Sequence, residues 1–312
     1  MNILIIGSNF GFKVYYRAIN SLIQKKKIVI CSPNIHKKKK LKKVKMFKCY
    51  KEAFQEYNSF DLIICATSPD IQKEVIFFLY KYKKLPKRLL LEKPISNNID
   101  ETIQILKKID NKKTKIFSNF IFSKIKNFKK LKTLIKNKKI NKIHYKWNFK
   151  QAYFINKQKT WKTNPKLGGG LVYYYLIHVI SNIRFLWKLG KNFSKIKFIK
   201  KNNLIYSLYM ENTFNKTKII IEINCNANKN LHQIICCNNN LSYKLVNKSS
   251  DWTKNFFLYK DKKKISEKSK EKRLDLTKLN LYEGINRYTN SLKNNIISNN
   301  QIISYLSKKI YK

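Results

Sequence analysis

Only seven glycines occur in the 312 residues, and five of them gather at two places. Gly7 and Gly11 flank a short segment near the start of the chain, and Gly168 to Gly170 form an uninterrupted run. Glycine is needed where φ is positive or where the backbone must come close to another group. Because this chain otherwise avoids glycine, we expect both places to lie at a functional site.

The segment Gly7-Ser8-Asn9-Phe10-Gly11 follows the apolar run 3–6 and precedes a helical pattern. A turn between a strand and a helix presents backbone N–H groups that bind a pyrophosphate. The match to the dinucleotide-binding fingerprint is incomplete, because Asn9 replaces the second glycine and Phe12 stands at the third position. Asn tolerates left-handed backbone better than most residues, so the turn can survive this change. An ordinary strand-to-helix turn is the alternative interpretation of this motif alone.

His178 follows the glycine run within a strongly apolar helical pattern. Imidazole has the side-chain pKa closest to neutrality, so a histidine can take the proton of a hydroxyl group as a C–H bond breaks. A buried histidine that is hydrogen-bonded to a carbonyl group is the alternative. The remaining histidines, which are His36, His144 and His232, show no partner in the sequence pattern.

The second expected strand ends in Cys31-Ser32-Pro33-Asn34, where NAD-binding proteins usually carry an acidic residue for the ribose. Ser32 and the nearby Lys37 would tolerate a 2′-phosphate, which favours NADP over NAD. Lys37 carries little information, however, because lysines recur throughout the chain.

Strands and helices alternate over residues 1–118, which predicts a doubly wound parallel sheet. The expected strands are 3–6, 27–31, 61–65, 88–91 and 114–120, with helices at 15–23, 71–82 and 99–109. The pattern then changes to a helical stretch and to strands at 143–149, 196–199, 204–209, 218–224, 234–237 and 241–245. Short connections indicate a largely antiparallel sheet, so residues 119–312 should form an α+β domain. Residues 248–280 give no clear pattern, and a final helix is expected at about 284–293.

The formal net charge of +51 first suggests a nucleic-acid partner. Only five of the 68 basic residues are arginine, although surfaces that read bases or clamp phosphates favour it. The abundance of Lys, Asn and Ile is what an A/T-rich coding bias produces. We therefore expect solvated lysine faces and no nucleic-acid partner, with a basic nucleic-acid-binding protein as the competing hypothesis.

Six cysteines, at positions 31, 49, 65, 225, 236 and 237, show neither a Cys-x-x-Cys pair nor the spacing of a zinc site. We expect free thiols, no metal and a cytoplasmic protein. The start of the chain lacks the pattern of a signal peptide, because its apolar run is short and ends at Gly7. The most apolar later segment, 171–187, contains polar residues and Arg184, which argues against a membrane-spanning helix.

Four motifs occur in a familiar order: Gly7 to Ala18, Ala66-Thr67-Ser68-Pro69, Glu92-Lys93-Pro94, and Gly168 to Gly170 followed by His178. Together they resemble the glucose-fructose oxidoreductase and inositol dehydrogenase family, called Gfo/Idh/MocA. The motifs span about residues 1–190, and the rest agrees only in architecture. The resemblance implies a Rossmann domain for NAD or NADP, followed by an α/β domain whose open sheet often serves for oligomerisation. It also implies redox chemistry at a hydroxyl or carbonyl group of a sugar, cyclitol or sugar nucleotide, and we expect a homo-oligomer.

The resemblance assigns catalytic roles to Lys93, beside the nicotinamide, and to His178, with Tyr174 one turn before the histidine. The residues implied to bind the cofactor are Gly7, Asn9, Phe10, Gly11, Ser32, Ala66, Thr67, Ser68, Pro69, Glu92, Lys93 and Trp161. Trp161-Lys162 resembles a Trp-Arg pair that often precedes the triple glycine. Two acidic residues common in the family are absent, because Tyr174 and Ser181 occupy their positions. A family member that binds the cofactor without catalysis is therefore an alternative.

Overall fold

The structure is a computed structural model that describes residues 1–34, 44–151, 160–201 and 204–311. It divides into two compact units. Unit 1 contains Met1–Asn119, Lys166–Gly168 and Thr277–Gln301, and unit 2 contains Phe120–Pro165, Gly169–Leu276 and Ile302–Lys312. The sequence pattern had assigned all of 119–312 to the second domain, whereas residues 277–301 cluster with unit 1.

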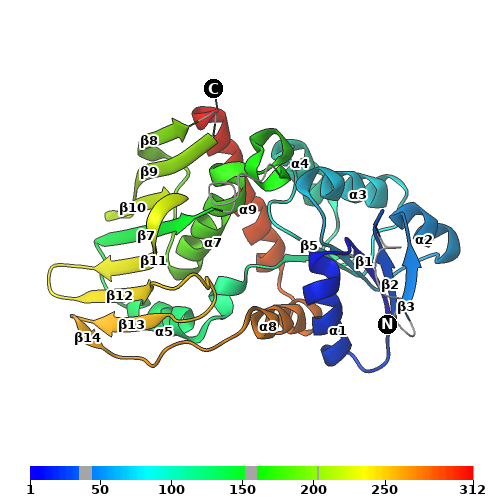
Figure 1. Cartoon of the computed structure of the whole chain (residues 1–312), viewed down its shortest axis with the longest axis horizontal. Helices are drawn as coiled ribbons and strands as arrows, with labels where there is room; N and C mark the ends of the chain where they lie inside the picture. Colours follow the sequence, from blue (N-terminus) through cyan, green and yellow to red (C-terminus); the bar gives the residue numbers. More distant parts are fainter. Residues whose placement is uncertain (35–43, 152–159, 202–203, 312) are drawn as a thin grey trace. The chain divides into compact units, whose positions relative to one another are not determined.

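Unit 1 is built on a six-stranded sheet with the order β3-β2-β1-β4-β5-β6, in which every neighbouring pair is parallel (Figure 1). The strands are β1 (Asn2–Ile6), β2 (Lys27–Cys31), β3 (Val44–Phe47), β4 (Leu62–Cys65), β5 (Arg88–Leu91) and β6 (Lys115–Ser118). Four successive apolar residues of β1 and of β4 are buried, as expected for strands covered on both faces. The predicted doubly wound parallel sheet is confirmed. Its strand order reverses between β1 and β4, where such sheets bind ligands.

Helices within residues 1–119 connect these strands. They are η1 (Gly11–Tyr16), which is π-helical, α1 (Arg17–Leu22), α2 (Tyr50–Glu56), α3 (Pro69–Lys81) and α4 (Ile99–Lys108). The sequence analysis missed β3 and α2. β3 is an edge strand whose residues are only partly buried, so it lacks the apolar run that marks the inner strands.

Unit 2 contains an eight-stranded sheet with the order β14-β13-β12-β11-β7-β10-β9-β8. The strands are β7 (Lys142–Lys150), β8 (Phe193–Lys201), β9 (Leu204–Phe214), β10 (Thr217–Asn224), β11 (Asn226–Cys237), β12 (Ser242–Asn247), β13 (Phe257–Lys260) and β14 (Lys263–Lys264). Only the β10–β7 pair is parallel. The predicted, largely antiparallel sheet is confirmed, and β13 and β14 lie in the stretch that had no clear pattern.

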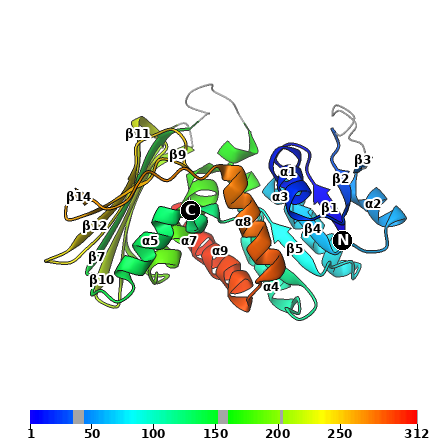
Figure 2. The same cartoon turned by 90° about the horizontal axis from the view of Figure 1, so that it is seen from below.

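Helices cover one face of this sheet. Figure 2 shows α5 (Lys126–Ile135) and α7 (Ile177–Leu186) on the same side of the unit 2 strands. Along β7, residues 143, 145, 147 and 149 are buried, while the residues between them are partly exposed. This alternation places an apolar core between sheet and helices. None of the described helices is long and apolar enough to cross a membrane.

The end of the chain forms two helices, α8 (Arg273–Asn286) and α9 (Asn290–Ile310). The single helix expected at 284–293 is therefore wrong, because the break between the two helices falls inside it. Gly284 lies where α8 packs closely on β6 within unit 1. A Cβ at this position would lie 2.3 Å from the Phe117 ring.

Candidate functional site

The turn after β1 lies against the end of β4. Gly7 has φ +110°, and a Cβ at this position would lie 2.3 Å from the carbonyl oxygen of Ala66. The backbone amide of Ala66 in turn donates to the carbonyl of Ile6. The structure thus brings together two motifs that start 59 residues apart, Gly7 to Gly11 and Ala66 to Pro69, at the carboxyl edge of the sheet where the strand order reverses.

Gly11 has a packing role. A Cβ there would lie 2.9 Å from a methyl group of Ile5, so η1 can approach β1 this closely only without a side chain. Close packing of helix on strand is the role of the last glycine in the dinucleotide fingerprint. Asn9 is not among the described residues with positive φ, so no left-handed geometry is needed where the second glycine is missing.

The amide groups of this turn are available to a ligand. The N–H groups of Ser8 and Asn9 donate to no acceptor among the described residues. They precede the N-terminus of a helix, where free N–H groups and the helix dipole favour an anion. These residues fit the pyrophosphate of a dinucleotide.

Two serines join the turn to the end of β2. The hydroxyl oxygens of Ser8 and Ser32 lie 2.8 Å apart and both side chains are buried. The described residues that directly follow β2, Ser32 to Asn34, therefore include a hydroxyl group and no carboxylate, as the sequence indicated. Lys37, which entered the NADP prediction, lies outside the described residues.

A buried glutamine holds the segment that contains Lys93. Gln72 of α3 is fully buried, and its Nε2 donates to the carbonyls of Glu92 (2.7 Å), Ile95 (2.9 Å) and Pro94 (3.2 Å). Its Oε1 accepts from the amide of Glu92 at 2.8 Å. One side chain thus bonds to three carbonyls and one amide of the loop after β5, and only a primary amide supplies both the donors and the acceptor.

The Glu92 carboxylate is fixed as well. It accepts a hydrogen bond from the hydroxyl of Tyr15 in η1 and a 3.3 Å bond from the amide of Lys93. Glu92 therefore couples the helix of the phosphate-binding turn to the Lys93 segment. This is a positioning role, distinct from the cofactor contact that the resemblance implied.

The three glycines of the second motif have separate reasons to lack a side chain. In unit 1, a Cβ on Gly168 (φ +81°) would lie 2.9 Å from Pro69. In unit 2, a Cβ on Gly169 would lie 2.0 Å from the carbonyl oxygen of Trp161, and Gly170 has φ +75°. The chain passes from unit 1 to unit 2 within this run.

Tyr174 lies beside the Trp161-Lys162 pair. Its ring centroid is 5.5 Å from that of Trp161 in an edge-to-face arrangement, and the Lys162 ammonium lies 5.6 Å from the ring centre. Tyr174 belongs to η6 (Leu171–Leu176), which is π-helical, so the α-helical i, i+4 spacing to His178 does not apply across it. Both glycine motifs thus open into π-helical segments, which are frequent at functional sites.

His178 lies on α7 in unit 2 and is 6% exposed. Its ring makes edge-to-face contacts with Phe122 (5.5 Å) and Trp147 (6.2 Å). Lys93 lies in unit 1, after β5. The two predicted catalytic residues are therefore carried by different units.

Thiol and metal chemistry find no support in the described residues. All six cysteines are free, and burial raises the pKa of the thiols of Cys31, Cys65, Cys225 and Cys236 above the ordinary value, which disfavours thiolate. No group of three or more His, Cys, Asp or Glu in the described part of the chain is placed to hold a metal ion.

Solved structures show the same two-part fold over the whole chain. One is a Gfo/Idh/MocA family oxidoreductase from Vibrio cholerae, with 12% identity, TM-score 0.70 and full coverage of both chains. Another is an oxidoreductase from Agrobacterium radiobacter in complex with NAD+, L-tartaric acid and magnesium, with 10% identity, TM-score 0.76 and coverage of 100% and 97%. A super-repressor mutant of Gal80p from Saccharomyces cerevisiae also matches, with 16% identity, TM-score 0.78 and coverage of 100% and 97%.

The strand order and the glycine turn define unit 1 as a Rossmann fold, the fold of dinucleotide-binding domains. A family model described as "Oxidoreductase family, NAD-binding Rossmann fold" matches residues 1–120, and no curated protein matches the chain. Residues 1–120 therefore belong to the Gfo/Idh/MocA oxidoreductase family, which confirms the resemblance drawn from the motifs.

Gln72 and Tyr15 are the site residues that sequence reasoning missed. A single glutamine in a helix and a tyrosine in an apolar stripe match no motif, and their roles follow from contacts across 20 and 77 residues. The buried position of Gln72 on an otherwise apolar helix face was the one available signal.

Proposed function

We propose that the chain is an NAD(P)-dependent oxidoreductase that transfers hydride to or from a hydroxyl-bearing or carbonyl carbon of a sugar, cyclitol or sugar nucleotide. The observation that carries the proposal is the turn of Gly7 to Gly11, with its free amides at the switch point of the sheet. Bound NAD(P) would supply the hydride acceptor or donor. The turn would hold the pyrophosphate, and the hydroxyl of Ser32 would face the ribose.

Two residues would handle the proton and the charge at the reacting carbon. His178 would take the proton of the substrate hydroxyl during oxidation, because imidazole titrates near neutral pH. The Lys93 ammonium would stabilise the developing alkoxide. Gln72 and Glu92 would hold the backbone around Lys93, so that its side chain starts from a fixed point.

The direct test measures hydride exchange between NADH or NADPH and a panel of sugars and cyclitols. We expect His178→Ala to lower the rate by roughly 100- to 10,000-fold, the range for loss of a general base, while cofactor affinity stays unchanged. His144→Ala is the matched control, because His144 pairs with Glu222 on the face of the sheet opposite to α7. Equal activity of wild type and His178→Ala on an accepted substrate would contradict the assignment.

A second candidate function is cofactor binding without catalysis. The observation that favours it is the pair Tyr174 and Ser181, which carry no carboxylate to balance a charged imidazole. The same fold also occurs in a protein described as a super-repressor, the Gal80p mutant, and not as an oxidoreductase. Tight NADH binding without hydride exchange on any panel member would support this candidate over the first.

A further inference from the structure

The helix that carries His178 contains a second buried polar residue, Asn182. Seven residues of α7 are buried, and the other five are aliphatic. Apolar contacts are not directional, so they hold the helix against the sheet without fixing how far it is turned about its axis. The two buried polar residues are four positions apart and therefore lie on the same side of the helix. A directional bond at one of them restricts the direction of the other.

Asn182 makes such a bond to the sheet of unit 2. Its Nδ2 donates to the hydroxyl oxygen of Tyr145 on β7 at 2.8 Å, and that hydroxyl is hydrogen-bonded to Nε2 of His232 on β11. Asn182 and His232 are each 3% exposed, and Tyr145 is fully buried. An amide Nδ2 only donates, so the proton of Tyr145 is directed to His232. Burial lowers the pKa of His232 to about 3, which keeps its ring neutral and able to accept.

The spacing of helix and strand matches along this contact. Four residues of an α-helix advance about 6 Å along its axis, and two residues of a strand advance about 6.6 Å. Asn182 lies against Tyr145, while His178, one turn earlier on α7, contacts Trp147, two residues later on β7, with ring centroids 6.2 Å apart. The hydrogen bond to Tyr145 therefore fixes both the rotation of α7 and its position along β7.

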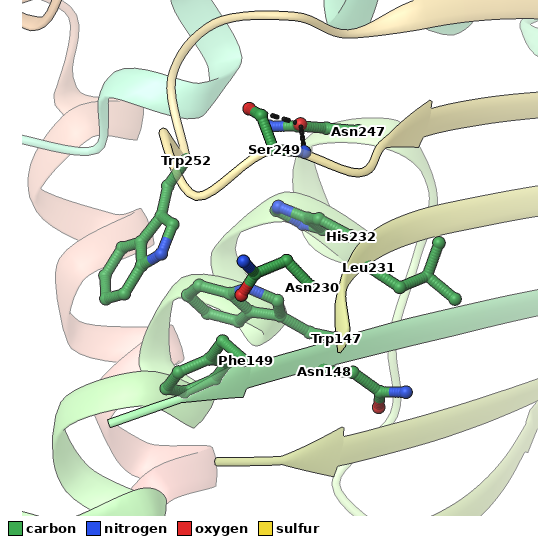
Figure 3. A pocket seen from close by; sticks show the side chains of 9 residues that line it. All are labelled: Trp147, Asn148, Phe149, Asn230, Leu231, His232, Asn247, Ser249 and Trp252. Atoms are coloured by element: carbon green, nitrogen blue, oxygen red, sulfur yellow. Dashed lines mark hydrogen bonds between the residues drawn. The ribbon is translucent and has the colours of Figure 1, made fainter. Parts of the chain in front are cut away.

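Two aromatic rings connect this hydrogen-bonded chain to the imidazole of His178. Trp147 stacks on His232 with centroids 4.9 Å apart, and Figure 3 shows these two rings side by side at a small pocket. Phe122 contacts both histidines edge-to-face, with centroids 5.5 Å from His178 and 5.3 Å from His232. The rings that pack on His232 thus also border His178.

The start of α7 explains why the helix needs this anchor. The preceding segment η6 is π-helical and joins α7 directly between Leu176 and Ile177. The i→i+5 bonds of a π-helix place more residues in each turn than those of an α-helix. The glycine run before η6 therefore does not by itself define the direction of His178. The anchor at Asn182 lies on the other side of the histidine along the chain.

We propose that Asn182 is a positioning residue, which through Tyr145 and His232 fixes the rotation of α7 and so directs the imidazole of His178. The proposal rests on the proposed function, in which His178 takes the proton of the substrate hydroxyl. Displacement of a reacting group by about 1 Å lowers a rate by up to roughly 100-fold. The dinucleotide-binding turn belongs to unit 1, so NADH binding should not depend on Asn182.

The test uses the full chain with Asn182→Leu, which keeps nearly the same shape and removes the donor. Tyr145 retains its own acceptor, so no buried donor is left unmatched. Asn127→Leu is the matched control, because this buried asparagine of α5 donates to the carbonyls of Phe256 and Glu267. The control loses two hydrogen bonds and Asn182→Leu loses one. A purely structural role of Asn182 therefore predicts the larger effect for the control.

The first readout needs no substrate. In protein labelled with ¹³C,¹⁵N-histidine, the ring signals of His178 are assigned by their loss in His178→Ala. Ring currents of Phe122 and Trp147 make these signals sensitive to the orientation of the imidazole. We expect the signals to move in Asn182→Leu and to stay in place in Asn127→Leu. Signals that are unchanged in Asn182→Leu, or that move equally in the control, would overturn the proposal.

The second readout is hydride exchange between NADH or NADPH and the panel of sugars and cyclitols. Asn182→Leu should lower kcat by about 10- to 100-fold with KM and NADH affinity unchanged, whereas Asn127→Leu should keep the wild-type kcat. Combined with His178→Ala, Asn182→Leu should cause no further loss, because it acts only through the histidine. An additive loss, or an unchanged kcat in Asn182→Leu, would overturn the positioning role.

The two readouts separate this proposal from the proposed function. If no member of the panel reacts while the His178 signals still depend on Asn182, the proposed function fails and the orientation of the ring by Asn182 stands. If the panel reacts and His178→Ala is slow while Asn182→Leu equals wild type in both readouts, the proposed function stands and the positioning role fails.

Discussion

At the scale of single residues, the buried side chain of Gln72 makes four hydrogen bonds to the loop after β5. In Gln72→Leu the carbonyls of Glu92, Pro94 and Ile95 lose their donor, and the amide of Glu92 keeps only a 3.3 Å bond to Cys65. Unmatched buried groups cost about 1–3 kcal/mol each, so we expect the free energy of unfolding to fall by about 3 kcal/mol or more in urea titration.

The neighbouring Ile71→Ala serves as the control for Gln72→Leu. Ile71 is 37% exposed on the same helix, so its loss should cost less than about 1 kcal/mol. Equal stability of the two variants would show that the loop does not depend on the buried amide.

His232 should make the protein less stable in acid. Burial lowers its folded-state pKa to about 3, whereas the unfolded chain titrates near 6.5, so between these values the unfolded state binds more protons. The stability contributed by the neutral ring is complete above about pH 6.5 and is lost as the pH falls toward 3. Between pH 7 and pH 5 this single residue should account for about 2 kcal/mol of lost unfolding free energy.

The measurement compares urea unfolding of wild type and His232→Gln at both pH values. All other titrating groups are common to the two proteins, so the difference in pH dependence reports His232. Identical pH dependence would contradict a buried neutral histidine, whatever the absolute stability of the variant.

At the scale of elements, the two glycines of the turn should respond differently to a methyl group. Gly7→Ala strains a φ of +110° and drives a Cβ into a backbone oxygen, which cannot move, so we expect a loss of about 3 kcal/mol or more and of NADH binding. Gly11→Ala meets a side-chain methyl at 2.9 Å, which can shift, so about 1–2 kcal/mol is expected. Thermal unfolding and NADH fluorescence show which of the two variants loses more stability and binding. A larger effect at Gly11 would contradict the described geometry.

The elements that the sequence predicted well are those with one strong local signal. Strands β1, β2, β4 and β5 are short apolar runs with buried side chains, and their bounds follow from the sequence to within a residue or so. β3 failed because an edge strand needs only partial burial, and the α8–α9 break failed because helical periodicity continues on both sides of it. β14 consists of two exposed lysines, so it has no apolar pattern to detect.

The candidate site divides in the same way. The glycines could be recognised in the sequence because a position with no room for a Cβ, such as Gly7 or Gly169, requires this residue type. Hydrogen-bonded partners that are far apart in the sequence could not be recognised in this way. Examples are Gln72 with the loop after β5, and His232 with Tyr145. Motifs therefore indicated the candidate site, while the hydrogen bonds that hold its backbone could be found only in the structure.

At the scale of the whole molecule, we propose that the chain forms a homo-oligomer through the face of the unit 2 sheet opposite to α5 and α7. This face carries Glu222, which bonds to His144 (2.8 Å) and Lys146 (3.0 Å), among many lysines. Glu222→Lys would place three basic groups together and should weaken association at least tenfold in sedimentation velocity, with NADH binding unchanged. A wild-type protein that stays monomeric at all concentrations would refute the proposal.

The central claim is that the Gly7 to Gly11 turn of unit 1 holds a nicotinamide dinucleotide. The most direct measurement is fluorescence titration of the purified chain with NADH and NADPH, together with Gly7→Ala. We expect saturable binding of at least one cofactor, with NADPH preferred because Ser32 and not an acid follows β2. Binding should disappear in Gly7→Ala. Failure of wild type to bind either cofactor, or unchanged binding by Gly7→Ala, would contradict the claim.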